Sequence, residues 1–133
     1  MQAQTLQSLE NEELELVLAE LARMRIRQLT SPVGIKLQRI VSAESRRFLD
    51  IFLSATELVT KPVVTFLSGI LRRHVSAGIV VSRNPDMAAT AFLSMAVGAP
   101  ARIAASGNKI DEAALEDRIA FTVELFLNGL HPR

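Results

Sequence analysis

Residues 58–98 of this 133-residue chain read LVTKPVVTFLSGILRRHVSAGIVVSRNPDMAATAFLSMAVG. In the first half of the stretch, from Val59 to Ala77, apolar residues recur every three or four positions, which places them on one face of a helix. Gly78 follows directly, shortly after the cationic run 72–74. Cations complement the negative end of a helix, and glycine readily adopts the left-handed conformation that ends one. This half therefore predicts a long helix that stops at Gly78.

The second half of the stretch predicts another helix after a short loop. Asn84 is a good capping residue, Pro85 fits a first helical position, and Asp86 complements the positive end of the helix. We expect this helix to run to about Val97 and to end at residues 98–100, which include a glycine and a proline. It is rich in alanine. Small side chains let neighbouring helices approach closely, so we expect it to pack on more than one side.

The N-terminal part of the chain predicts two helices. Apolar residues from Leu6 to Leu29 follow helical spacing and predict a helix of about twenty residues. Its acids lie early and its arginines late, which complements the helix dipole. Ser31 is expected to cap the second helix, with Pro32 at the first position and an apolar stripe over residues 33–48.

Shorter signals complete the predicted order of helices. Residues 49–56 predict a brief helix, and Thr56–Glu57 resembles a new cap before the long helix. Residues 101–110 predict a connection of small residues with a turn. Asp111 is expected to cap the final helix, which should end at residues 128–129.

The final helix has a broader apolar arc than one core surface can cover. Its main stripe runs from Leu115 to Leu130, while Phe121 and Leu125 point away from that stripe. We therefore expect part of this helix to contact a second subunit. The alternative is a central helix enclosed entirely by its own chain.

Two polar residues within apolar stripes have alternative interpretations. Glu44 is either a buried acid that lines a cavity or a residue at the edge of the stripe, paired with a neighbouring cation. His74 either binds a ligand in a pocket or is a core-edge histidine that complements the end of its helix.

The composition predicts a single domain, because 133 residues suffice for one core. The chain is 49% hydrophobic, which indicates a protein interface or an apolar cavity. We expect no membrane span, since Gly98, Pro100 and Arg102 interrupt the longest apolar run, 88–105. The first residues do not resemble a signal peptide, and the absence of cysteine excludes disulfides, so a cytoplasmic location is expected.

The motifs of catalysis and metal binding are missing. There is no glycine-rich phosphate loop, no nucleophile elbow and no histidine or cysteine spacing for a metal, so we expect neither an enzyme nor a cofactor. The net charge of +1 gives no general attraction to nucleic acid. One cluster and one pair of cationic residues either contact phosphates or form a solvated face, and the lack of Trp and Tyr favours the second interpretation. The cluster is Lys36, Arg39, Arg46 and Arg47, and the pair is Arg72 and Arg73.

The order of four motifs resembles the effector-binding C-terminal domain of TetR-family transcriptional repressors. These motifs are VSAESRRF at 41–48, HVSAG at 74–78, NPDMAA at 84–89 and FLSM at 92–95, followed by Gly98. The resemblance covers about residues 29–130. It implies an all-α antiparallel bundle of five or six helices, whose last two helices form a four-helix bundle with those of a second subunit. It also implies a cavity for a small hydrophobic effector between the earlier helices.

The chain departs from the family in one respect. Nothing before Leu29 resembles the three-helix DNA-reading unit of the family, so we expect no direct contact of this chain with nucleic acid. Residues 1–133 are expected to form one domain, with residues 1–31 as a connector helix and 32–130 as the core. The chain would then be either the C-terminal region of a longer regulator or a natural short homologue.

The expected function is ligand sensing and homodimerisation in a TetR-like regulator, where the effector shifts the connector helix. The alternative is a helical interaction module that forms homodimers or heterodimers without a ligand. The residues expected to line the effector cavity are Leu37, Val41, Phe48, Phe52, Phe66, Ile70, His74 and Met95. Those expected at the dimer surface are Ala88, Phe92, Ala96, Ala114, Phe121 and Leu125.

Overall fold

The computed structural model describes residues 13–44 and 49–132. These residues form helices and loops, without a strand, so the predicted all-α fold is confirmed. The helices within the described ranges are α2 (Leu14–Thr30), α3 (Pro32–Glu44), α4 (Leu49–Ser76), α5 (Pro85–Ala105) and α6 (Glu112–Leu130).

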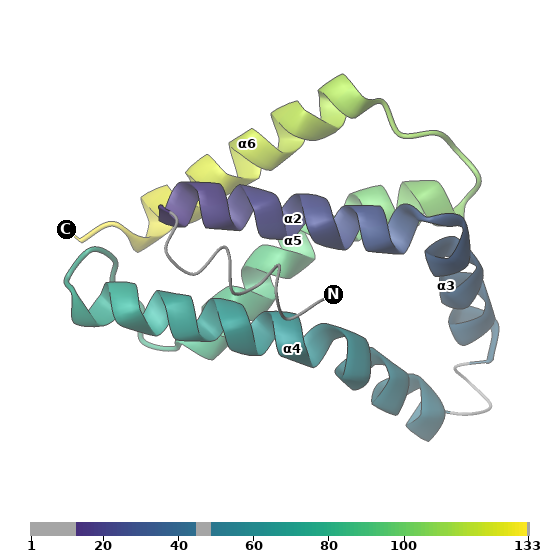
Figure 1. Cartoon of the computed structure of the whole chain (residues 1–133), viewed down its shortest axis with the longest axis horizontal. Coiled ribbons are helices and arrows are strands. Elements are labelled where there is room, and N and C mark those ends of the chain that lie inside the picture. Colours follow the sequence, from purple (N-terminus) through teal and green to yellow (C-terminus); the bar gives the residue numbers. More distant parts are fainter. Residues whose placement is uncertain (1–12, 45–48, 133) are drawn as a thin grey trace.

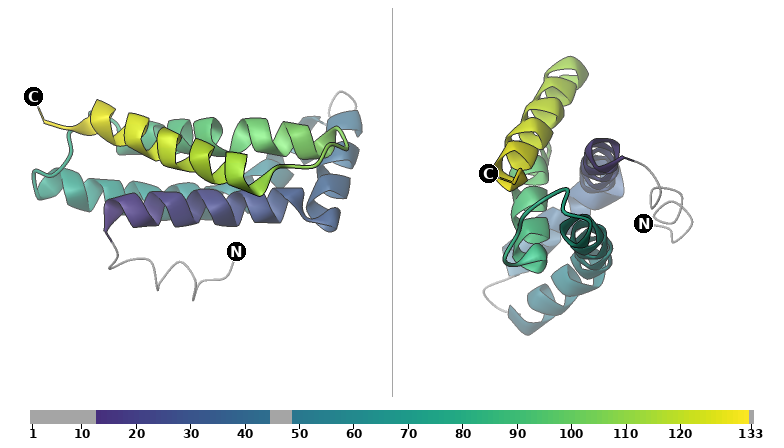
Figure 2. Two further views of the ribbon diagram at one scale, coloured as in Figure 1. Left: turned by 90° about the horizontal axis from the view of Figure 1, so that it is seen from above. Right: turned by 90° about the vertical axis from the view of Figure 1, so that its left-hand side faces the viewer.

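Four of these helices run along the length of the molecule, and α3 crosses them at one end, between the end of α2 and the start of α4 (Figures 1 and 2). The chain reverses direction between α4 and α5 and again between α5 and α6 (Figure 1). Helix α5 packs against each of the other four described helices. The alanine-rich helix is therefore at the centre of the bundle, as its small side chains predict.

The core lies where α2, α4, α5 and α6 meet. At its centre the rings of Phe92 and Phe126 pack with their centroids 5.0 Å apart. Helix α2 contributes fully as a core element, because Val17, Leu18 and Leu21 have no exposed surface. The hydrophobic core therefore includes α2; the division into a connector of residues 1–31 and a core region of residues 32–130 stays a prediction. Its largest fully buried side chains are Phe92, Leu18, Leu21, Ile26, Leu67, Ile70, Leu71, Ile119, Val17 and Val63.

The predicted helix starts are confirmed by their capping hydrogen bonds. The Ser31 hydroxyl accepts from the Gly34 amide at 3.0 Å, one turn into α3. The Asn84 side chain accepts from the Met87 amide at 3.0 Å, with proline at the first position of α5. The Asp111 carboxylate accepts from the amide of the second residue of α6 at 3.2 Å.

The predicted end of the long helix is confirmed too, because α4 ends at Ser76 and Gly78 has φ +77°. That left-handed conformation favours glycine.

The prediction that the alanine-rich helix ends at residues 98–100 is wrong. Helix α5 continues through Pro100 to Ala105, so the connection to α6 starts at residue 106 and not at 101. A proline inside a helix costs about 3 kcal/mol, because it removes one hydrogen bond and crowds the preceding turn. Ala101 and Ala104 are nevertheless 7% and 6% exposed. Since helices in proteins are stabilised mainly by packing, burial of this last segment maintains the helix beyond the proline.

The predicted break before the long helix is also wrong. Helix α4 runs without interruption from Leu49 to Ser76, with Pro62 inside it, so Thr56 does not cap a new helix. Threonine and glutamate occur in helix interiors as well as at caps. No glycine or proline lies between residues 49 and 57 to end the preceding segment.

Contrary to the sequence expectation, residues Pro85–Ala104 of α5 are long and apolar enough to cross a membrane by length and composition. The core helix of a bundle passes the same test. Ala89, Phe92 and Ala96 are at most 1% exposed and belong to the core cluster of this fold. Contacts with the other helices therefore account for the apolar character of α5.

Candidate functional site

Three of the residues expected to line the effector cavity lie on α4. Ile70 is 1% exposed and belongs to the core cluster, while Phe66 and His74 are half-buried beside it. The Nδ1 atom of His74 lies 2.8 Å from the Ile70 carbonyl oxygen. Because a carbonyl oxygen only accepts, Nδ1 carries the proton of this hydrogen bond. His74 is thus hydrogen-bonded to its own helix near the helix end, as expected of a histidine at the edge of the core.

The other five expected residues are dispersed. Leu37 on α3 and Met95 on α5 are 56% and 38% exposed. Phe48 lies outside the described residues, as do the side chains of Val41 and Phe52. The described members of the set therefore have three different environments: the core, its edge and the surface. That the set forms one effector cavity stays a prediction.

The structure contains a pocket that none of these eight residues lines. It has a volume of about 340 Å³ and lies between the end of α2, the start of α3, the end of α5 and the start of α6. Five of its twelve lining residues are charged. The lining residues are Arg23, Ile26, Arg27, Thr30, Ile35, Ala104, Asn108, Lys109, Ile110, Glu112, Leu115 and Glu116.

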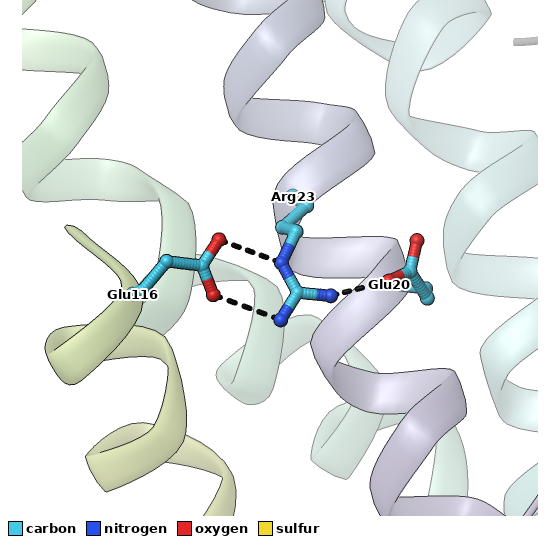
Figure 3. Close-up of polar contacts among 3 residues, drawn as sticks. All are labelled: Glu20, Arg23 and Glu116. Carbon is cyan, nitrogen blue, oxygen red and sulfur yellow. Dashed lines mark hydrogen bonds and ion pairs between the residues drawn. The ribbon is translucent and has the colours of Figure 1, made fainter. Parts of the chain in front are cut away.

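An ion pair forms one wall of this pocket (Figure 3). Arg23 donates from Nε to Glu116 Oε1 at 2.7 Å and from Nη2 to Glu116 Oε2 at 2.8 Å, and it also contacts Glu20 on its own helix. The hydrogen bonds from Arg23 hold the pKa of the Glu116 carboxyl below its usual value, and Glu116 raises the pKa of Arg23. The pair joins the middle of α2 to the first turns of α6.

A second cation of α2 lies inside the bundle, and the sequence analysis missed it. Arg25 is 7% exposed, and its Nη1 donates to Gln28 Oε1 at 2.9 Å. Burial lowers the pKa of Arg25. Within the part of the chain that the structure describes, no carboxylate pairs with this guanidinium.

The signal for Arg25 is present in the sequence, because it follows Leu14, Leu18 and Leu21 at helical spacing, in the centre of the buried stripe. The charge pattern alone assigns it to the cationic end of its helix.

The residues expected at the dimer surface separate into two groups. Phe92 and Ala96 are 0% and 1% exposed within one chain, so they have no surface to offer to a partner. Phe121 and Leu125 on α6 are 65% and 55% exposed. Ala114 is exposed and Ala88 is half-buried. A dimer surface would therefore be formed by Phe121, Leu125 and their neighbours.

Comparisons with known proteins agree with this architecture. Residues 16–129 match the family described as "AefR-like transcriptional repressor, C-terminal domain". A crystal structure from Mesorhizobium loti MAFF303099, whose description assigns it to the TetR family of transcriptional regulators, superposes with a TM-score of 0.81 at 22% identity. The alignment covers 96% of this chain and 65% of that protein, and at this identity it shows the fold alone. No curated protein matches the chain.

Proposed function

The chain belongs to the family of AefR-like C-terminal domains of TetR-type transcriptional repressors, and on this premise we propose that it dimerises and senses a small hydrophobic effector. Regulators of the TetR family typically act as dimers and bind small-molecule effectors, and the family is regulatory, not enzymatic. We propose accordingly that this domain has no catalytic role and works in the cytoplasm.

The observation that supports dimerisation is the uncovered apolar face of α6. Phe121 and Leu125 lie one turn apart and are both more than half exposed. Arg118 of the same helix donates from Nη2 to the carbonyl oxygen of Met95 at 3.1 Å, so α6 lies directly beside α5 on this side of the molecule. Large apolar side chains gathered on one exposed surface are typical of a protein interface. A second copy of this surface would complete a four-helix bundle of α5 and α6 from each subunit.

We place the effector between α2, α3 and α4, where the resemblance to the family expects it. On α4, Phe66 packs against the core and His74 is half-buried, and the residues of the expected set are retained as the proposed lining of this cavity. The pocket beside Arg23 suits a hydrophobic effector less well, because five of its twelve lining residues are charged. Effector binding would then shift α2 against α3 and α4 and so change DNA binding by the regulator that carries this domain.

Two measurements test the proposal. Light scattering of the chain at micromolar concentration should give twice the mass of one chain. A thermal-shift screen of small hydrophobic and aromatic compounds should raise the melting temperature for some of them, because a ligand that binds only the folded state stabilises it. A dimer that responds to no compound would instead support the interaction module that works without a ligand. A single-chain mass would contradict the dimer.

A further inference from the structure

Arg25 is an unusual residue for the centre of a helix face that is otherwise apolar. Leu18 and Leu21, the preceding residues of the stripe, have no exposed surface, and Arg25 itself is 7% exposed. A guanidinium group has five N–H donors, and the described structure records one hydrogen bond from it, to the neutral amide of Gln28. The charge is therefore buried without an opposite charge among the described residues.

Such an arrangement does not stabilise the fold. Burial of an ionised group is unfavourable unless an opposite charge and further hydrogen bonds compensate for lost hydration. Burial lowers the pKa of Arg25, and no carboxylate within residues 13–44 and 49–132 forms an ion pair with it to offset this cost. By contrast, Arg23 and Arg72 each pair with a carboxylate at the surface. An apolar side chain at position 25 would continue the stripe and pack against the same neighbours.

We propose that Arg25, supported by Gln28, binds the anionic group of the effector, so that the ligand of this domain is a small amphipathic carboxylate. This rests on the proposed function, which it makes more specific. A carboxylate matches the planar fork of the guanidinium with two parallel hydrogen bonds. The apolar body of the ligand follows from the proposed function, which expects a small hydrophobic effector. Ligand binding would neutralise a charge that no described carboxylate compensates.

The test uses the whole chain and two pairs of probes matched in size, hexanoate with hexan-1-ol and benzoate with benzyl alcohol. Thermal-shift and calorimetric titrations are made for the native chain, Arg25→Met and Arg25→Lys. We expect the native chain to bind a carboxylate more tightly than its matched alcohol. Arg25→Met should weaken carboxylate binding about ten- to a hundredfold, the equivalent of one or two charge-assisted hydrogen bonds, and should leave alcohol binding unchanged. Arg25→Lys should keep part of the preference.

Arg27→Met is the matched control, because Arg27 lies on the same helix, is exposed and lines the pocket beside Arg23. Arg27→Met should retain the preference for carboxylates. If Arg27→Met lost this preference and Arg25→Met kept it, the ligand would bind in the pocket beside Arg23 and the proposal would be overturned. Without ligand, Arg25→Met should melt no lower than the native chain. A much lower melting temperature would show instead that Arg25 supports the fold.

The outcomes also separate this inference from the proposed function. If the alcohols stabilise the chain as well as the carboxylates do, effector sensing stands and the role of Arg25 is refuted. If no probe and no compound of the wider screen stabilises the chain, both the sensing function and the role of Arg25 are refuted.

Discussion

Arg23 of α2 and Glu116 of α6 lie 93 residues apart in the sequence and form an ion pair through two hydrogen bonds, 2.7 Å and 2.8 Å long. The pair fixes the first turns of α6 against the helix that carries the buried Arg25. It also forms one wall of the pocket at this end of the bundle. The α2–α6 contact is therefore partly electrostatic, whereas the core contacts of the same two helices are apolar.

Glu116→Gln should lower stability slightly, because the pair is exposed to solvent and screened. The pKa of Glu116 is depressed in the folded state, so its contribution is complete above the ordinary glutamate pKa. The contribution is lost as the pH falls from the ordinary glutamate pKa through the lower pKa that Glu116 has in the folded state. Urea denaturation should therefore show a difference between the native chain and Glu116→Gln at neutral pH that disappears in acid. A stability difference between the two chains that grew in acid would contradict a stabilising role for the ionised Glu116 carboxylate.

Gly34→Ala should destabilise the corner between α2 and α3. A Cβ atom at Gly34 would clash with the carbonyl oxygen of Gln28, a backbone atom that cannot move without shifting α2 or α3. Overpacking of this kind costs about 1–3 kcal/mol. Gly69→Ala is the matched control, since a Cβ there meets nothing within 4 Å in the middle of α4.

Gly69→Ala should raise the free energy of unfolding by about 0.5–1 kcal/mol, because alanine has a better helix propensity than glycine. Chemical denaturation of both variants gives the comparison. Equal effects of the two substitutions would show that the close approach at Gly34 is not tight.

Phe92→Ala should lower the free energy of unfolding by about 3–5 kcal/mol, because it leaves a cavity in the core. Phe92 is fully buried and packs against Phe126. If Phe92 acted only at a dimer surface, the substitution would change the dissociation constant of the dimer and leave the unfolding of the monomer unchanged. Denaturation at several protein concentrations distinguishes these two effects.

The double substitution Phe121→Ser and Leu125→Ser should give a folded monomer. Both side chains are more than half exposed in one chain, so their loss removes apolar surface from the proposed interface and not from the core. Light scattering should show the mass of a single chain, and circular dichroism should show unchanged helix content. Ile79→Ser is a suitable control, because Ile79 is 54% exposed in the loop between α4 and α5. If the double variant remained dimeric, the interface would lie elsewhere.

Local sequence signals predicted the helix boundaries where a cap or a stop was chemically explicit. Ser31, Asn84 and Asp111 each cap the helix that they were expected to cap, and Gly78 adopts the left-handed conformation expected of it. Such signals are reliable because they depend on hydrogen bonds within a few residues of the chain. The signals failed at Pro100 and at Thr56, where a locally plausible break lies inside a continuous helix.

The sequence by itself thus determined the all-α class, most helix ends and the apolar surplus of the last helix, because periodicity and capping are local properties. Only the tertiary structure decided which stripes meet. Phe92 is enclosed while Phe121 is exposed, and Arg25 is buried while Arg27, two residues later, is at the surface. Helical phase gives the direction in which a side chain points, but its environment depends on which helix packs there. That choice is made by the fold as a whole.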